Sequence, residues 1–123
     1  IESTKKTEEI DEERENKIAA LPFRSPMIIV VIAKVNYDKP NVPRLEQIQS
    51  TAAAAQNILL SLHALKYGAI WRTGIFSLNK EINSYFNIAE NEWILGYIYT
   101  GTISGEIKKL PKINIKDYVS KWS

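Results

Sequence analysis

The sequence predicts an α+β fold in which a small antiparallel or mixed sheet is packed by helices. Residues 27–33 form a continuous apolar run that is typical of a strand buried on both faces. Residues 92–100 alternate aromatic and aliphatic side chains, which also predicts a strand. Between these segments, residues 43–67 repeat apolar side chains at helical spacing. With a third strand near Gly68, these elements predict a single domain.

The composition excludes several classes of function. Sixteen basic and fourteen acidic residues give a net charge of +2, which argues against nucleic acid or an anionic membrane as a partner. The chain has no cysteine, so it has neither disulfides nor thiolate chemistry, and we expect a cytoplasmic protein. His63 is the only histidine, and no metal site is predicted. No apolar run approaches the roughly 18 residues that a membrane span requires.

The N-terminal segment, residues 3–21, is predicted to form a solvated helix. Residues 1–20 carry a net charge of −3, with acidic side chains in the early turns, where the helix dipole favours them. The apolar stripe consists only of Ile10, Ile18 and Leu21, so the helix needs a neighbour to be stable. Pro22 ends it. The chain begins at Ile1, which suggests a fragment or a processed start.

The apolar strand at residues 27–33 is predicted to be central in the sheet. After a polar loop at residues 36–42, Pro43 is expected at the first helical position, because its ring fixes a helical φ. The helix is expected to reach Tyr67, with Gly68 as its stop. One face of this helix carries apolar side chains in a 3,4,3,4,3 spacing: Leu45, Ile48, Ala52, Ala55, Leu59 and Leu62.

Shorter elements complete the prediction for the core, residues 27–101. Ser77 is expected to cap a short helix over residues 78–85, and residues 87–91 form a polar break. In the strand that follows, Gly96 marks a close backbone approach, and Gly101 ends the strand. Residues 102–123 form a basic, aromatic tail whose apolar side chains need a docking surface.

The segment from Gly68 to Gly74, with the sequence Gly-Ala-Ile-Trp-Arg-Thr-Gly, is predicted to be a ligand-facing turn. Together with the residue 27–34 run, the Val42-Pro43-Arg44 helix start and the residue 95–101 run, it resembles the nitroreductase family of FMN-dependent oxidoreductases. The resemblance is to the small bacterial branch with a Gly-x-Ile-Trp-Arg-Ser/Thr-Gly turn. It covers residues from about Ala20 to the C-terminus.

This resemblance implies an enzyme that needs no catalytic side chain, because the cofactor carries the reactive atoms. The implied reaction is ping-pong: NAD(P)H reduces FMN by hydride transfer, and the reduced flavin passes electrons to a nitroaromatic or quinone-like acceptor. The implied FMN contacts are Trp71, Arg72, Thr73 and Gly74, with backbone donors at the flavin edge. From the residues alone, a buried Trp71 with Arg72 in a surface ion pair is the alternative.

Two further sets of residues have weaker implied roles. The end of the long helix corresponds to the stretch that relatives use for the nicotinamide nucleotide: Ser61, Leu62, His63, Ala64, Leu65 and Lys66. Cationic side chains are also common at helix ends for electrostatic reasons. Lys109 and Lys112 are similar to the segment that neutralises the FMN phosphate, with a solvated tail as the alternative. Arg24 and Arg44 are expected to be structural or surface residues.

The resemblance also implies a homodimer with FMN at the subunit interface and tails that reach across to the partner. Family members begin with a further segment, about a third of the domain, that carries an Arg-Arg-Ser motif absent from this chain. We therefore expect residues 1–123 to be a single partial nitroreductase-like domain with its N-terminal part missing. The alternative function is a non-catalytic protein-interaction module that uses the aromatic and basic tail.

Overall fold

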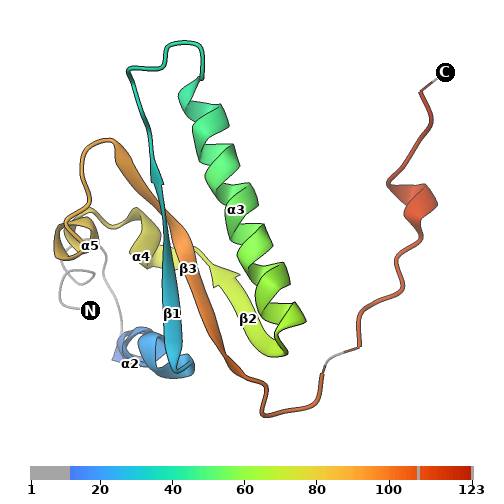
Figure 1. The fold of residues 1–123 in the computed structure, drawn as a ribbon. Helices are drawn as coiled ribbons and strands as arrows, with labels where there is room; N and C mark the ends of the chain where they lie inside the picture. The colour runs from blue at the N-terminus through green and yellow to red at the C-terminus, as the bar shows by residue number, and fades with distance from the viewer. Residues whose placement is uncertain (1–11, 108, 123) are drawn as a thin grey trace.

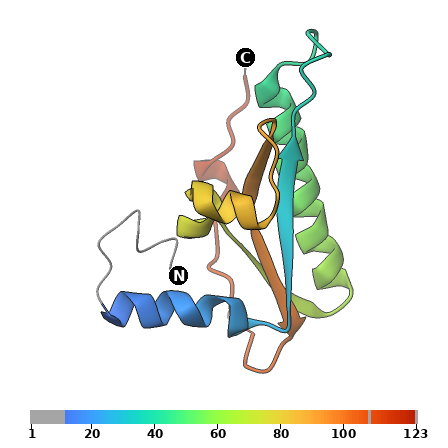
Figure 2. The ribbon, with the colours of Figure 1, turned by 90° about the vertical axis from the view of Figure 1, so that its left-hand side faces the viewer.

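The computed structural model describes residues 12–107 and 109–122 of the chain. Its centre is an antiparallel three-stranded sheet in the order β1-β3-β2, formed by β1 (Met27–Lys34), β2 (Tyr67–Arg72) and β3 (Glu92–Thr102). Helix α3 lies along one side of this sheet, and α2, α4 and α5 lie on the other side (Figures 1 and 2). The predicted α+β fold, with strands near Met27, Gly68 and Glu92, is confirmed.

The prediction that β1 is the central strand is wrong. Within the described part of the chain, β3 pairs with both neighbours, and β1 lies at an edge of the sheet. The apolar run reflects cover on the two faces of the strand, whereas strand order depends on the backbone groups at its two edges. Met27 and Ile32 are exposed, so even the cover of the faces is incomplete.

Helix α3 spans Arg44–Ala64, and Pro43 is its N-cap residue instead of its first helical residue. The predicted end at Tyr67 is three residues too late, and Gly68 is not the stop. Lys66, with a φ of 67°, turns the chain after the helix, and its N–H donates to the His63 carbonyl oxygen at 3.0 Å. Gly68 lies in β2 opposite Gly101, and Tyr67, which was predicted to be helical, is also part of this strand.

The core lies between α3 and the sheet. Val31 of β1, Ala55 of α3 and Ile98 of β3 are buried together, and Ala55 and Ile98 are completely inaccessible to solvent. Ala55 lets the helix approach the sheet closely because its side chain is only a methyl group. Partly buried side chains surround these three: Ile29, Ile58, Leu59, Leu62, Trp71 and Leu95. The predicted apolar face of α3 is thus confirmed in its middle and C-terminal parts, whereas Leu45 is exposed.

The other side of the sheet carries the shorter helices. Helix α2 (Glu12–Ala20) continues into the 3₁₀ turn η1 (Leu21–Arg24), so the α-helix ends before Pro22 as predicted. The part of the predicted N-terminal helix before residue 12 lies outside the described residues. Two short helices follow β2, namely α4 (Gly74–Leu78) and α5 (Lys80–Tyr85).

The predicted cap at Ser77 is wrong. Ser77 lies inside α4, where its hydroxyl donates to the Thr73 carbonyl oxygen at 2.7 Å. Asn79 takes the capping role for α5, since its Oδ1 accepts from the Ile82 N–H at 3.3 Å. The break between α4 and α5 places Asn79, and not Ser77, just before the first residue of α5.

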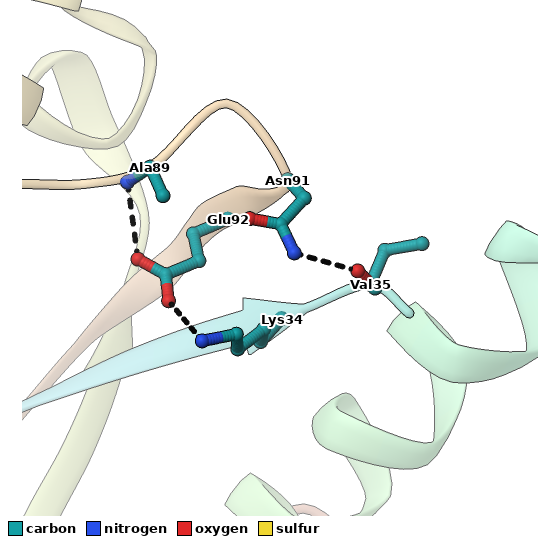
Figure 3. Close-up of polar contacts among 5 residues, drawn as sticks. All are labelled: Lys34, Val35, Ala89, Asn91 and Glu92. Carbon is teal, nitrogen blue, oxygen red and sulfur yellow. Dashed lines mark hydrogen bonds and ion pairs between the residues drawn. The ribbon is translucent and has the colours of Figure 1, made fainter. Parts of the chain in front are cut away.

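Strand β3 begins at Glu92 as predicted but continues through Gly101 to Thr102, because Tyr67 and Gly68 of β2 pair with these residues. Polar contacts fix its start (Figure 3). The Glu92 carboxylate accepts from the Ala89 N–H at 3.1 Å and forms an ion pair with Lys34 at 3.5 Å. Asn91 donates from Nδ2 to the Val35 carbonyl oxygen at 2.8 Å. The predicted polar break at residues 87–91 therefore anchors β3 to the end of β1.

The tail after Thr102 extends away from the sheet and contains one short 3₁₀ turn, η2 (Ile115–Asp117) (Figure 1). Its apolar side chains are exposed, including Ile107 at 80% and Leu110 at 89%. The predicted need for a docking surface is not met within the described part of this single chain. Among the helices described, none is long and apolar enough to cross a membrane.

Candidate functional site

The candidate site is a cleft of about 960 Å³ on the side of the sheet away from α3. Its walls come from η1 and the connector to β1, from β2 and α4, and from the C-terminal half of β3. The residues that line it are Leu21, Arg24, Ser25, Pro26, Gly68, Ala69, Ile70, Trp71, Arg72, Thr73, Gly74, Phe76, Tyr97, Tyr99, Thr100, Gly101 and Thr102. All seven residues of the predicted ligand-facing segment are therefore cleft residues.

The pairing of β2 with β3 determines which side chains face the cleft. Residues paired across antiparallel strands project to the same side of a sheet, and successive residues project to opposite sides. Trp71 is paired with Ile98, which packs under α3, so both belong to the α3 side. Ile70 with Tyr99, and Arg72 with Tyr97, therefore belong to the cleft side.

The predicted turn from Gly68 to Gly74 is a strand as far as Arg72, and the prediction of a turn is wrong for this part. The extended backbone results from pairing with β3, which the local sequence does not reveal. Only Thr73 and Gly74 leave the strand, and Gly74, with a φ of 60°, begins α4. The segment thus lines the cleft as an edge strand, followed by one change of direction.

Trp71 is held by the sheet through its indole. Its Nε1 donates to the Leu95 carbonyl oxygen at 3.2 Å, and the ring packs against the α3 side of the core. Gly96 makes room for it, because a Cβ at position 96 would lie 2.4 Å from Trp71 Nε1. The predicted close approach at Gly96 is thereby explained. The indole of Trp71 is therefore packed within the fold, as in the alternative given above, while Trp71 also belongs to the cleft lining.

Tyr97 is a buried residue of the cleft lining. Its ring stacks edge-on against Phe76 with centroids 6.5 Å apart, and its hydroxyl donates to the Phe76 carbonyl oxygen at 3.3 Å. Burial, and secondarily the neighbouring Tyr99, raise the pKa of Tyr97 from 10.0 to about 12. The phenol is therefore a neutral hydrogen-bonding group at physiological pH.

The other predicted site residues lie elsewhere. The six residues from Ser61 to Lys66 form the end of α3 and the turn after it, and none of them lines the cleft. Leu62 contributes to the core, whereas His63, Leu65 and Lys66 are exposed. Lys109 and Lys112 are exposed in the tail and also lie outside the cleft. A single chain therefore does not bring the end of α3 or the two tail lysines to the residues of the Gly68 to Gly74 segment that line the cleft.

The wall of the cleft opposite β2 and α4 was not predicted from the sequence. Arg24, Ser25 and Pro26 come from η1 and the connector to β1, and they lie near the C-terminal end of β3 because Met27 pairs with Thr100 of β3. Pro26 packs directly on Gly101, where an added Cβ would lie 2.6 Å from the proline Cδ. No local signal identified Arg24 as a cleft residue, since its place depends on a strand pairing across more than 70 residues of sequence.

Comparison with known proteins agrees with this architecture. The sequence model described as "Nitroreductase family" matches residues 1–102. The chain belongs to the nitroreductase family. The match includes the acidic N-terminal segment, so the expectation that the resemblance begins near Ala20 was too narrow. The match ends at residue 102, before the tail.

Two relatives with nitroreductase names are similar to most of this chain. The "Putative NAD(P)H nitroreductase YdjA" of Escherichia coli (strain K12) is 33% identical over 107 residues, which cover 87% of this chain and 57% of the relative. The "Putative NAD(P)H nitroreductase" of Haemophilus influenzae is 26% identical over 113 residues, which cover 91% and 61%. The chain therefore spans about three fifths of the length of these relatives.

One similar solved structure is that of a nitroreductase-like family protein from Bacillus cereus. It superposes with a TM-score of 0.68 at 20% identity, and the superposition covers 90% of this chain and 60% of that chain. At this identity the likeness concerns the fold alone. It confirms the predicted nitroreductase-like arrangement of the sheet and its helices.

Proposed function

We propose that this nitroreductase chain is part of an FMN-dependent NAD(P)H oxidoreductase that reduces nitroaromatic or quinone-like acceptors. The observation that carries the proposal is the cleft along β2, which gathers the whole Gly68 to Gly74 segment at one edge of the sheet in a chain of this family. The names of the relatives support NAD(P)H as the electron donor.

The residues of the cleft fit FMN. β2 lies at the edge of the sheet, so one line of its backbone N–H and C=O groups has no strand partner among the described residues. Such groups suit the polar edge of a flavin ring, and the side chains of Ile70 and Tyr99 offer it apolar surface. None of the described lining residues is acidic, and an anionic cofactor therefore meets no like charge.

Each residue of the motif has a distinct part in this proposal. Trp71, tied to Leu95, contributes its backbone and holds the strand edge in place. Arg72 supplies a permanent positive charge and hydrogen-bond donors beside the flavin. Thr73 and Gly74 contribute backbone N–H groups where the chain leaves the strand. When bound, FMN would supply the ping-pong hydride chemistry between NAD(P)H and the acceptor.

The remaining contacts are proposed to come from a second subunit. Ser61 to Lys66 would contact the nicotinamide nucleotide, and Lys109 and Lys112 would neutralise the FMN phosphate. All of these residues lie outside the cleft of their own chain, and the tail that carries the two lysines extends away from the sheet. A homodimer in which each tail docks on the partner would also cover the exposed apolar side chains of that tail.

The test is FMN binding and NADH oxidation. The protein is purified in the presence of FMN, both as the 123-residue chain and as the longest product of the gene that encodes it. We expect quenched flavin fluorescence on binding and steady NADH oxidation with a nitroaromatic acceptor. Failure of the longest product to bind FMN and to oxidise NADH would contradict the proposal.

The site assignment is tested with paired arginine variants. Arg72→Gln should weaken FMN binding several-fold, because a charged hydrogen-bond donor beside the flavin is lost. Arg44→Gln is the matched control, since Arg44 lies over the Trp93 ring, 4.2 Å from its centroid, and outside the cleft. Equal FMN affinity in both variants would show that Arg72 does not contact the cofactor.

The exposed tail favours one alternative, a non-catalytic protein-interaction module. Trp122 and Leu110 are exposed at 102% and 89%, and a tail with several exposed large apolar side chains is a candidate for contact with another protein. A full-length product that neither binds FMN nor oxidises NADH, but whose binding to a partner protein is lost on deletion of residues 103–123, would support this alternative over the enzyme.

A further inference from the structure

Two arginines from different parts of the chain line the candidate cleft. Arg24 belongs to η1, which precedes β1, and Arg72 ends β2. Both side chains are exposed, and within the described part of the chain the ion pairs involve other residues, Lys17 with Glu13 and Lys34 with Glu92. The cleft therefore has two cations available to a ligand.

The rest of the lining gives these cations no counterion. The described residues of the cleft include no aspartate or glutamate. Apolar and aromatic side chains, among them Ile70, Phe76 and Tyr99, make up much of the surface between the two walls. Unpaired guanidinium groups beside apolar surface attract an anion more strongly than they would in open water, because the surroundings screen the charges less.

The shape of a matching ligand follows from these two features. A planar ring would bury its faces against the apolar and aromatic side chains. An anionic group on that ring would accept paired hydrogen bonds from a guanidinium, whose planar fork matches the oxygens of a carboxylate or phosphate. A neutral ring of the same size would gain only the first of these interactions.

We propose that Arg24 and Arg72 together make this cleft selective for aromatic ligands that carry an anionic group, with Arg24 as the specificity-determining residue. Arg72 already has a place in the proposed flavin site, whereas Arg24 has none. In the enzyme of the proposed function, on which this part of the inference rests, the selected ligand is an anionic aromatic electron acceptor such as a nitrobenzoate.

The experiment compares 4-nitrobenzoate with 4-nitrobenzamide, which have nearly the same shape but differ in charge. Their binding to the 123-residue chain is followed by quenching of tryptophan fluorescence at low ionic strength. We expect the carboxylate to bind about tenfold more tightly, as one charge-assisted contact would provide. This preference should decline as salt is added, because the cleft is open to solvent.

The variants locate the preference at Arg24. Arg24→Gln should reduce the preference to about twofold or less while the affinity for 4-nitrobenzamide stays the same. Arg24→Lys should retain part of it, since the charge remains without the planar fork. Arg44→Gln, outside the cleft, should retain all of it. Thermal melts of the variants check folding, and we expect little change for the exposed side chain of Arg24.

Three results would overturn the inference: equal affinity for the two ligands, no binding of either at millimolar concentration, or a preference that Arg24→Gln leaves intact. A parallel comparison of FMN with riboflavin separates the flavin phosphate from an acceptor anion. If Arg24→Gln lowers only the preference for FMN, the anion is that of the cofactor and the acceptor assignment is wrong.

Failure of this inference can be distinguished from failure of the proposed function. Binding of 4-nitrobenzoate requires neither FMN nor NADH. If the protein shows an Arg24-dependent preference but never oxidises NADH, the proposed enzymatic function is refuted and the proposed anion selectivity of the cleft stands. If the protein oxidises NADH but shows no such preference, the proposed function stands and the proposed selectivity is refuted.

Discussion

The indole Nε1 of Trp71 donates a hydrogen bond to the carbonyl oxygen of Leu95 at 3.2 Å and so ties β2 to β3 through a side chain. Leu95 is the residue at which the pairing of β1 with β3 shifts, because Val31 pairs with Gly96 and Ile32 pairs with Ile94. A bulged residue bends its strand and interrupts the ladder. The bond of Trp71 stabilises this irregularity and holds β2, whose residues line the cleft, against β3.

Replacing Trp71 by Phe should lower the free energy of unfolding by about 1–3 kcal/mol. The substitution removes the indole donor, leaves the Leu95 carbonyl oxygen without this partner and opens a small void. Urea unfolding measures the change. Trp122→Phe is the control, since Trp122 is 102% exposed and should change stability by no more than about 0.5 kcal/mol. Similar losses in both variants would contradict a structural role for the Trp71 bond.

Gly96→Ala should be more damaging than any exposed glycine substitution. Its added Cβ would lie 2.4 Å from Trp71 Nε1 and 2.6 Å from the Arg72 carbonyl oxygen, at a φ of 142° that L-residues rarely adopt. We expect a loss of more than about 3 kcal/mol in urea unfolding, or no folded protein. Gly105→Ala serves as the control because an added Cβ there meets no atom within 4 Å. A well-folded Gly96→Ala variant of unchanged stability would contradict the close approach of β2.

Tyr97 should make stability fall in alkaline solution. Its pKa is raised from 10.0 to about 12 in the folded protein, so the unfolded chain releases this proton first. The free energy of unfolding therefore decreases as the pH rises from about 10 to about 12, by up to about 2–3 kcal/mol from this group. Phenolate absorbance should show a component with a midpoint near pH 12 that Tyr97→Phe abolishes. If the component near pH 12 persists in Tyr97→Phe, its assignment to Tyr97 is refuted.

Glu92 should contribute more to stability than its ion-pair partner. Glu92 accepts from the Ala89 N–H and has a side chain only 20% exposed, whereas Lys34 is 72% exposed. We expect a loss of about 1–2 kcal/mol for Glu92→Ala, because a backbone donor loses its partner. Lys34→Ala should cost at most about 0.5 kcal/mol.

The double variant of Glu92 and Lys34 isolates the ion pair from the hydrogen bond to Ala89. Its unfolding in urea should yield a coupling energy below about 1 kcal/mol, since one partner is solvated. A coupling as large as the whole effect of Glu92→Ala would mean that the ion pair, and not the hydrogen bond, anchors the start of β3.

Tertiary structure decided which side chains share a site. The apolar run of β1 predicted a strand but not its edge position, because the hydrogen-bonding edges of a strand are perpendicular to the faces that hydrophobicity reports. The helical pattern before Gly68 could not show where α3 ends, since β2 takes the following residues for its ladder with β3. Arg24 reaches the cleft only through the pairing of Met27 with Thr100.

The sequence by itself determined the local elements of this member of the nitroreductase family. The spacing of apolar residues predicted α3, and the alternation after Glu92 predicted β3, because both patterns are set by backbone geometry within a few residues. The role of Gly96 as a point of close approach was also readable, although its partner Trp71 was not. The order of the strands, the side of the sheet on which the cleft forms and the presence of Arg24 and Arg72 in one cleft depend on contacts between distant residues, which only the folded chain specifies.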